Sequence, residues 1–349
     1  MTATILPSPD DLRAAVVSNP RARARDLAVR LGVTEADLCA ARCGAEATRI
    51  AAHPDTLMPG LTALGEVMAL TRNDSCVIEK VGVYDGYRPG DHAALVVNHD
   101  IDLRLFPRHW VHAFALDEEG PNGRKRSIQI FDAAGDAIHK IHLRPASDAA
   151  AFDALVARLR LPDQGRRLDL AARVQPEPAK GNPDRADDLR AGWDKMTDTH
   201  QFMRLTARLK MNRLGAYRMA GTPYVRALAP GSVETLLERA AATGLPVMVF
   251  VGNMGCIEIH TGPIHRVERM GPWINVLDPG FDLHLRMDHI AEIYAVVKNT
   301  QRGPAHSVEF FDARGALIAQ IFGVLRADAA AVAGWSALVA DLPTAGDAA

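Results

Sequence analysis

The stretch Ser127-Ile-Gln-Ile-Phe131-Asp132-Ala-Ala-Gly135-Asp-Ala-Ile138 occurs a second time, as Ser307-Val-Glu-Phe-Phe311-Asp312-Ala-Arg-Gly315-Ala-Leu-Ile318. Each copy has an apolar run, a tight Asp-Ala-x-Gly turn and a second apolar run, which is typical of an antiparallel β-hairpin. The offset between the two copies is 180 residues. This repeated hairpin is the starting point from which the rest of the chain can be read.

The same offset relates the two halves well beyond the hairpin. Asn73 and Cys76 correspond to Asn253 and Cys256, and the register continues without a gap to Ile141 and Ile321. Further matched pairs are Gly82 with Gly262, Asp102-Leu103-x-Leu105 with Asp282-Leu283-x-Leu285, and His109 with His289. A gapless register that keeps turn glycines and strand apolars indicates an internal duplication. It predicts an α+β fold with two tandem repeats, each an extended antiparallel sheet with flanking helices.

The domain boundaries follow from a change in composition. Residues 162–189 are rich in Pro, Arg, Asp and Gly, so they are expected to form a linker between a first repeat, 1–161, and a second, 190–349. Helices are expected across 8–52 and at 149–161, 187–194, 199–210 and 232–242. Strands are expected at 67–71, 76–83, 94–98, 101–106, 109–116, 127–131, 137–143, 247–251, 256–262, 274–277, 282–286, 290–297, 307–311 and 316–322.

Composition narrows the class of protein. The 349 residues are 48% hydrophobic and 23% charged with a formal net charge of −2, as in an ordinary globular protein. A basic excess is absent, and Glu35 and Asp37, in a segment that resembles a helix-turn-helix, would face phosphate badly; both points argue against a nucleic-acid partner. The start lacks the pattern of a signal peptide, and the longest uncharged run, 240–257, is broken by Gly and Pro, so membrane insertion is not expected. The four cysteines are expected to be reduced thiols in a cytoplasmic protein.

The stretch 193–205, Trp-Asp-Lys-Met-Thr-Asp-Thr-His-Gln-Phe-Met-Arg-Leu, contains the most informative histidine. Asp198 and Gln201 have the spacing of a capping box, which would place His200 in the first turn of a helix extending to about Lys210. The positive end of the helix dipole would keep the imidazole neutral, with a free lone pair. With Trp193, Phe202 and Met203 nearby, this suits axial ligation of a flat, apolar metal cofactor such as haem. The alternative is a histidine that only caps or packs.

Three segments resemble the hemin-degrading factors, cytoplasmic haem-binding and haem-trafficking proteins of Gram-negative haem-uptake systems. They are Thr197-Asp-Thr-His-Gln-Phe202, Met270-Gly-Pro-Trp-Ile-Asn-Val276 with the preceding Gly262-Pro-Ile264, and Phe281-Asp-Leu-His-Leu-Arg286. The resemblance covers essentially the whole chain, including the duplication. It implies that His200 is the proximal iron ligand of a haem b (iron protoporphyrin IX). The further haem contacts that it implies are Arg104, Phe106, Arg213, Phe250, Lys298 and Gln320.

The roles implied for these residues differ. Arg104 and Phe106, from the first repeat, match the distal side, whereas Arg213 and Lys298 match the residues that hold the propionates. Gln320 matches a nearby polar contact; the family often has a tyrosine before this glutamine, but here the residue is Ala319. Phe250, together with Met248, is expected to pack on the porphyrin. Without the resemblance, Arg104 would be read as a strand arginine paired with Asp100 or Asp102.

Two classes of function stay open at this point. The first is a carrier that accepts imported haem, possibly from an inner-membrane importer, and delivers it for iron release, possibly to a downstream haem oxygenase. The alternative is an enzyme that opens the porphyrin ring with external reductant and oxygen. The reductant would have to be external because the chain has no dinucleotide-binding fingerprint of its own. One haem per chain is expected, since the position equivalent to His200 in the first repeat is Pro20, and no catalytic residue is assigned.

Overall fold

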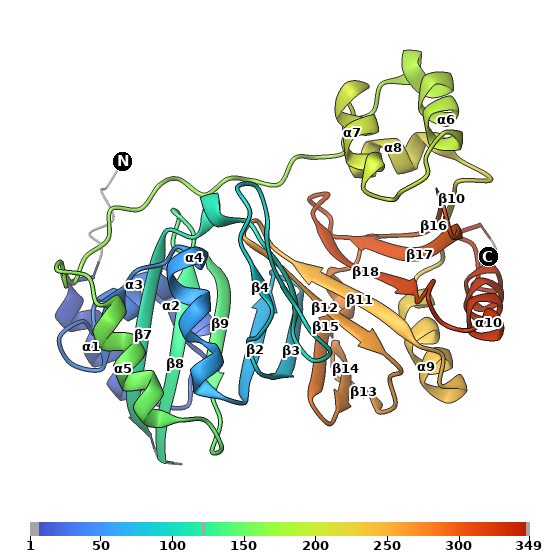
Figure 1. Cartoon of the computed structure of the whole chain (residues 1–349). Helices are drawn as coiled ribbons and strands as arrows, with labels where there is room; N and C mark the ends of the chain where they lie inside the picture. Colours follow the sequence, from blue (N-terminus) through green and yellow to red (C-terminus); the bar gives the residue numbers. More distant parts are fainter. Residues whose placement is uncertain (1–6, 121–122, 347–349) are drawn as a thin grey trace. The chain divides into compact units, whose positions relative to one another are not determined.

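The computed structural model describes residues 7–120 and 123–346, which form two compact units (Figure 1). Unit 1 comprises the chain up to Arg72, Glu79–Val174 and Gly252–Glu258. Unit 2 comprises Asn73–Ile78, Gln175–Val251 and the chain from Ile259 onward. Each unit therefore includes a short segment from the opposite half of the chain. The predicted boundary at 162–189 did not anticipate this exchange of segments. Residues 162–182 of that predicted linker have no helix or strand.

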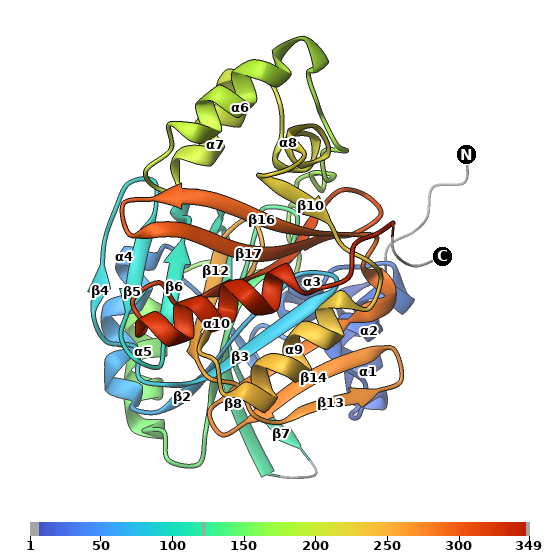
Figure 2. The ribbon, with the colours of Figure 1, turned by 90° about the vertical axis from the view of Figure 1, so that its right-hand side faces the viewer.

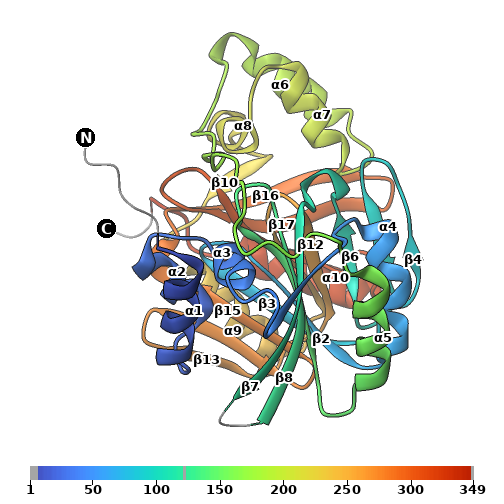
Figure 3. The same cartoon turned by 90° about the vertical axis from the view of Figure 1, so that its left-hand side faces the viewer.

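Unit 1 has a helical layer followed by antiparallel strands (Figure 3). Its α-helices are α1 (Pro9–Ser18), α2 (Ala24–Leu31), α3 (Glu35–Ala40), α4 (Pro54–Leu57) and α5 (Ala149–Leu159). A sheet with the order β1-β7-β8-β9-β2 consists of β1 (Ala47–Ile50), β7 (His112–Gly120), β8 (Gly123–Phe131), β9 (Ala137–Leu143) and β2 (Val67–Arg72). Residues 256–258 of β12 (Cys256–Gly262) pair with β6 (Asp102–Leu105), followed by β5 (Ala94–Val97) and β4 (Tyr87–Arg88).

Unit 2 repeats this arrangement (Figure 2). Its α-helices are α6 (Ala186–Asp194), α7 (Gln201–Arg208), α8 (Arg213–Ala220), α9 (Ser232–Thr243) and α10 (Ala329–Ala340). The sheet order β10-β16-β17-β18-β11 involves β10 (Val225–Ala227), β16 (Glu292–Thr300), β17 (Gly303–Phe311), β18 (Leu317–Gly323) and β11 (Val247–Gly252). The first residues of β3 (Cys76–Gly82) lie beside β15 (Phe281–Arg286), followed by β14 (Trp273–Asp278) and β13 (Val267–Met270).

Helices cover both faces of the sheet β16-β17-β18-β11 in unit 2. On one face, α9 and α10 pack on apolar strand residues such as Val249, Val308 and Phe310. On the other, α6, α7 and α8 pack on Tyr294 and Val296 of β16. Alternate residues of the same strands thus supply two separate cores, as the period of two in a β-strand requires. The second helical layer also packs on Phe311 of β17 and Leu317 of β18, whereas Met248 and Phe250 of β11 are half-buried.

The fold class expected from the duplication is confirmed: the elements of the two halves recur in the same order, at the offset of 180 from β2 and β11 onward. The helices before them are related by a slightly smaller offset, since α2 begins at Ala24 and α7 at Gln201. α1, α2 and α3 correspond to α6, α7 and α8, and α5 corresponds to α10. The expectation of helix throughout 8–52 is wrong at its end, where Ala47–Ile50 forms a strand paired with β7. Among residues 7–120 and 123–346, no helix is both long and apolar enough to cross a lipid bilayer.

The argument that Glu35 would face phosphate is also wrong. Its side chain is buried, with Oε1 accepting from Nζ of Lys140 at 2.6 Å and Oε2 paired with Arg72. Burial raises the pKa of Glu35, but the two neighbouring cations outweigh that effect and lower it to about 2. Asp37 is the partner of Thr34 in a capping box of α3.

The core of unit 1 contains a chain of buried polar side chains. His139 lies between two hydroxyls, 2.8 Å from Thr71 Oγ1 through Nδ1 and 2.5 Å from Tyr84 Oη through Nε2. Thr71 Oγ1 is also 3.4 Å from Sγ of Cys256, and Nδ1 of His139 is 3.9 Å from a carboxyl oxygen of Glu258. Glu258 is fully buried, and neither of its carboxyl oxygens has a hydrogen-bond partner among the described residues.

The other copy of the repeat is apolar at all of these places. Its residues at the offset of 180 are Val251, Ile264, Ala319, Cys76 and Ile78, which all belong to the apolar core of unit 2. The same fold is therefore built without the polar groups. Burial raises the pKa of Glu258 to about 8 and lowers that of His139 to about 3, so both side chains are neutral at pH 7.

The buried carboxyl of Glu258 should make stability fall with pH. In the unfolded chain a glutamate ionises near 4.5, whereas the folded carboxyl keeps its proton up to about 8. The folded state therefore binds more protons, and raising the pH disfavours it. Between pH 6.5 and 8, Glu258 should cost the wild type about 1.5 kcal/mol.

Urea unfolding at these two pH values measures the effect. Glu258→Ile, which installs the residue of the second copy, should remove this part of the pH dependence. Glu119→Gln, which removes an exposed carboxylate of β7, should keep it. A pH dependence that is equal in the wild type and in Glu258→Ile would contradict the prediction.

Candidate functional site

His200 is the N-cap residue of α7, and its ring projects into solvent with 92% of the side chain exposed. Its Nδ1 is 2.7 Å from Oδ1 of Asp198, which also accepts the backbone N–H of His200 at 2.8 Å. These two bonds lower the pKa of Asp198. An ionised carboxylate only accepts, so Nδ1 must carry the hydrogen, and in the neutral form of the ring Nε2 has the lone pair. A carboxylate that orients the far nitrogen in this way is a common support for a metal-binding histidine.

The predicted capping box between Asp198 and Gln201 is wrong. Asp198 instead binds His200, while Oε1 of Gln201 accepts the backbone N–H of Thr197 at 2.9 Å. The helix runs from Gln201 to Arg208, so it is shorter than expected and His200 precedes its first turn. The Asp198 carboxylate therefore orients the imidazole ring of His200 and does not cap the helix.

The aromatic residues near His200 do not line an open pocket. Trp193 and Phe202 are fully buried, and their ring centroids are 4.8 Å apart. Trp193 donates from its indole N–H to the carbonyl of Val297 at 2.8 Å, which fixes α6 on β16. Met203 is different: it follows His200 by almost one helical turn and is 51% exposed. Met203 is therefore the apolar group next to the imidazole that a ligand can reach.

Arg213, at the start of α8, lies next to this face of α7. Its Nη2 is 3.5 Å from Sδ of Met203, and Nη1 donates to Oε2 of Glu309 at 2.7 Å. The position of α8 is set by Asn212, its N-cap residue, which accepts the N–H of Gly215 at 2.9 Å. Gly215 also allows a close approach, because a Cβ there would be 2.0 Å from the carbonyl oxygen of Lys180. The structure thus places Arg213, one of the two predicted propionate contacts, beside Met203 on the helix that His200 caps.

Lys298 is placed differently from what its predicted role would suggest. Its side chain is only 2% exposed, and its ammonium donates to Tyr217 Oη at 2.8 Å and to Glu309 Oε1 at 2.6 Å. The rings of Phe202 and Tyr217 lie about it, with centroids 5.0 and 5.1 Å from Nζ. Burial lowers the pKa of Lys298 to about 8, although Glu309 opposes this. Direct contact between Lys298 and a propionate stays a prediction.

Glu309 is the centre of this cluster. The side chain is fully buried in β17 and also accepts from Tyr217 Oη at 2.8 Å and Ser307 Oγ at 3.0 Å. Burial raises its pKa, but Lys298 and Arg213 outweigh that effect and lower it to about 2. Glu309 is therefore an ionised carboxylate shared by two cations.

Phe250 and Gln320 lie on the same face of the sheet as Glu309. The cross-strand register places Glu309 opposite Gln320, and Gln320 opposite Phe250. The next row contains Phe322 opposite Met248, and the rings of Phe250 and Phe322 are 5.3 Å apart. These four side chains are half-buried, whereas Glu309, beneath α8, is fully buried. This side of the face thus offers an apolar surface with one amide.

Arg104 and Phe106 lie in unit 1, at the end of β6. Arg104 is paired with Asp102, donates to the carbonyl of Leu103 at 3.2 Å, and is 33% exposed. The pairing with a strand aspartate that the sequence left open is therefore present. Phe106 is half-buried, and its N–H donates to the carbonyl of Gly255 at 2.9 Å. Their distal role stays a prediction.

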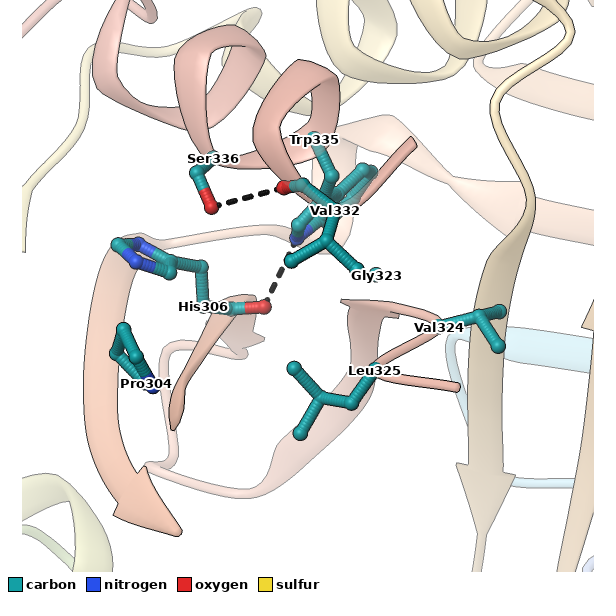
Figure 4. A pocket seen from close by; sticks show the side chains of 8 residues that line it. All are labelled: Pro304, His306, Gly323, Val324, Leu325, Val332, Trp335 and Ser336. Atoms are coloured by element: carbon teal, nitrogen blue, oxygen red, sulfur yellow. Dashed lines mark hydrogen bonds between the residues drawn. The ribbon is translucent and has the colours of Figure 1, made fainter. Parts of the chain in front are cut away.

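Two other kinds of site can be set aside. A small pocket lies between β17, β18 and α10, lined by Pro304, His306, Trp335 and their neighbours (Figure 4). It is smaller than the cavities that hold drug-sized ligands, and it lies on the face opposite Glu309. Among residues 7–120 and 123–346, no group of three or more His, Cys, Asp or Glu side chains could hold a metal ion.

Sequence reasoning missed Glu309, Tyr217 and the orienting role of Asp198. Glu309 has a sequence signal, since it interrupts the apolar run Val308 to Phe311 where the first copy has Gln129. Tyr217 has none, because its role depends on the packing of α8 on the sheet.

Comparison with known proteins agrees with the duplication. The family model for the haemin-degrading HemS/ChuX domain matches twice, at residues 32–159 and 210–342. Each match falls in one copy of the repeat.

Relatives match along nearly the whole chain. The hemin transport protein HmuS of Yersinia pestis is 38% identical over 310 residues, covering 88% of this chain and 89% of HmuS. Holo-PhuS, a heme-binding protein from Pseudomonas aeruginosa, superposes with a TM-score of 0.90 at 41% identity, covering 97% of this chain and 100% of PhuS. ChuS, a heme-degrading enzyme of Escherichia coli O157:H7, superposes with a TM-score of 0.86 at 31% identity, covering 96% of this chain and 100% of ChuS. The chain belongs to the haemin-degrading HemS/ChuX family.

Proposed function

We propose that this protein binds one haem b through Nε2 of His200 and carries it between the protein that supplies it and the protein that consumes it. The observation that carries the proposal is the exposed imidazole of His200, whose Nδ1 is held by Asp198. Met203 and Arg213 lie on the same side of α7 and supply an apolar contact and a cation. A bound haem would supply the iron and the redox chemistry; the chain supplies binding, orientation and charge.

The groups around His200 match the chemistry of a haem. A porphyrin needs apolar walls, and its two propionates need cations near the rim. Phe250, with Met248 and Phe322, offers an apolar surface on the β18–β11 side of the sheet, and Gln320 offers an amide. In this proposal Arg213 and Lys298 attract the propionates.

Arg104 and Phe106 complete the proposal from unit 1. An arginine is always protonated and only donates, so Arg104 would act as a hydrogen-bond donor on the distal side and not as an iron ligand. Phe106 would add an apolar contact there. Both assignments rest on the family resemblance.

Carriage is favoured by what relatives are and by how the ligand is held. HmuS is a hemin transport protein and PhuS a heme-binding protein. One histidine on a helix end, exposed to solvent, suits a ligand that must be received and passed on. We propose an inner-membrane haem importer as the donor and a haem oxygenase as the acceptor, in the cytoplasm.

Ring opening is the second candidate, because ChuS, at 31% identity, is a heme-degrading enzyme. Such activity would need an external reductant and oxygen, and the donor groups of Arg104 would be the ones to assist it. The two candidates predict different responses to catalase.

Replacing the imidazole tests haem binding. Haem titration of the wild type should saturate at one equivalent per chain, and His200→Ala should weaken binding at least tenfold and shift the Soret band. The matched control is His99→Ala, because His99 is also exposed and its Nδ1 is 2.7 Å from Asp100. Two equally tight haems, or equal effects of the two substitutions, would refute the proposal.

Haem breakdown distinguishes the carrier from the enzyme. With ascorbate as reductant, catalase should abolish breakdown in the wild type, because free peroxide attacks a haem that is merely bound. Product identification with and without catalase, in the wild type and in Arg104→Ala, is the measurement. Continued turnover in the presence of catalase that Arg104→Ala lowers tenfold or more would make this protein a haem-degrading enzyme.

A further inference from the structure

Two cations share one carboxylate beneath the proposed haem face. Arg213 and Lys298 both bind Glu309, and Tyr217 binds all three. The two cations differ in access, since the side chain of Arg213 is 22% exposed and that of Lys298 is 2% exposed. A propionate that arrives from solvent therefore has better access to Arg213 than to Lys298.

We propose that Glu309 is a positioning residue that fixes the guanidinium of Arg213 for a propionate, with Lys298 as its buried support. This inference rests on the proposed haem binding and goes further, because it assigns the direct contact to Arg213 and a new role to Glu309.

The donor inventory of Arg213 supports this assignment. A guanidinium has five N–H donors in a rigid fork. Arg213 directs Nη1 to Glu309 at 2.7 Å and to Tyr217 at 3.4 Å, and Nη2 to Sδ of Met203 at 3.5 Å. Donors therefore remain on the Nε and Nη2 edge, on the side of Met203. Because Glu309 binds Nη1, at the other end of the planar guanidinium, it restrains the direction in which the Nε and Nη2 edge points.

Charge also favours a single external carboxylate at this place. Lys298 and Arg213 carry two positive charges, and the ionised Glu309 cancels one. The remaining charge attracts a propionate. Removal of Glu309 would leave a buried ammonium without a counter-ion, and the guanidinium would be drawn toward solvent or toward Tyr217.

The first copy of the repeat shows that the fold does not need a carboxylate here. Gln129 occupies the equivalent position and donates to Ser127 Oγ at 3.2 Å, as Ser307 binds Glu309 in the second copy. The first copy has no cation at the places equivalent to Arg213 and Lys298, which are Glu35, the first residue of α3, and Glu118. In the first copy the sheet instead supplies a cation, Lys140, opposite Gln129, and it pairs with the carboxylate of Glu35 on α3.

The test compares haem with haem dimethyl ester, which keeps the iron and the ring but has no propionate charge. The wild type should bind haem more tightly than the ester. Glu309→Gln should lower that preference about tenfold, mainly through weaker haem binding, and change ester affinity less than threefold. Arg213→Met should lower the preference at least as much. Gln129→Glu, which adds a carboxylate at the equivalent position of the other copy, should leave it unchanged.

Structural damage gives a different result from lost positioning. Thermal unfolding of each ligand-free variant reports on the fold, and Glu309→Asp, which keeps the charge on a shorter arm, should recover part of the preference. Equal losses of haem and ester affinity in Glu309→Gln, or an unchanged preference, would overturn the inference. So would a larger loss of preference in Lys298→Met than in Arg213→Met. A wild type that binds neither compound would instead refute the proposed function.

Discussion

A single buried carboxylate anchors the helical layer of unit 2 to its sheet. Glu309 projects from β17 and receives Lys298 from β16 and both Arg213 and Tyr217 from α8. Removing one partner of such a buried ion pair typically costs about 3–5 kcal/mol, because the other charge is left without compensation. The cluster therefore determines where α8 lies, and through the contact of Arg213 with Met203 it is tied to α7 and His200. The site is placed by an interaction that itself stays out of reach of solvent.

The two copies solve the same packing problem with opposite charge arrangements. In unit 2 the carboxylate is on the sheet and one cation is on a helix. In unit 1 the carboxylate is Glu35 on α3, and the cations are Lys140 and Arg72 on the strands β9 and β2. What the fold requires is a satisfied ion pair between the helical layer and the sheet, since an unpaired buried charge is not tolerated. Which side supplies the carboxylate is free to change.

The sequence was sufficient for the fold class, because the fold class depends on local patterns, whereas the role of His200 as an iron ligand stays a prediction. Alternating apolar residues, turn glycines and a constant offset predict the strands and the duplication without any knowledge of tertiary contacts. Lys298 and Glu309 show where this reasoning ends. Both are charged residues on strands, which sequence patterns assign to solvent; they are buried because α7 and α8 cover that part of the sheet. The segments exchanged between the halves escaped for the same reason, since long-range contacts decide which unit they join.

The two copies differ at helix ends as well as at buried polar positions. The N-cap residue of α7, His200, corresponds to Arg23, the N-cap residue of α2, and at that spacing Asp198 and Met203 correspond to Arg21 and Asp26. Arg213, the first residue of α8, corresponds to Glu35, the first residue of α3. The first copy thus lacks the imidazole, the carboxylate that orients it, the apolar neighbour and the cation. Since exposed positions at helix ends can change at little cost to stability, one copy could gain a ligand site while both kept the frame. The frame supplies rigid helix ends over a sheet, and a small set of exposed side chains on one copy turns it into a candidate site for haem.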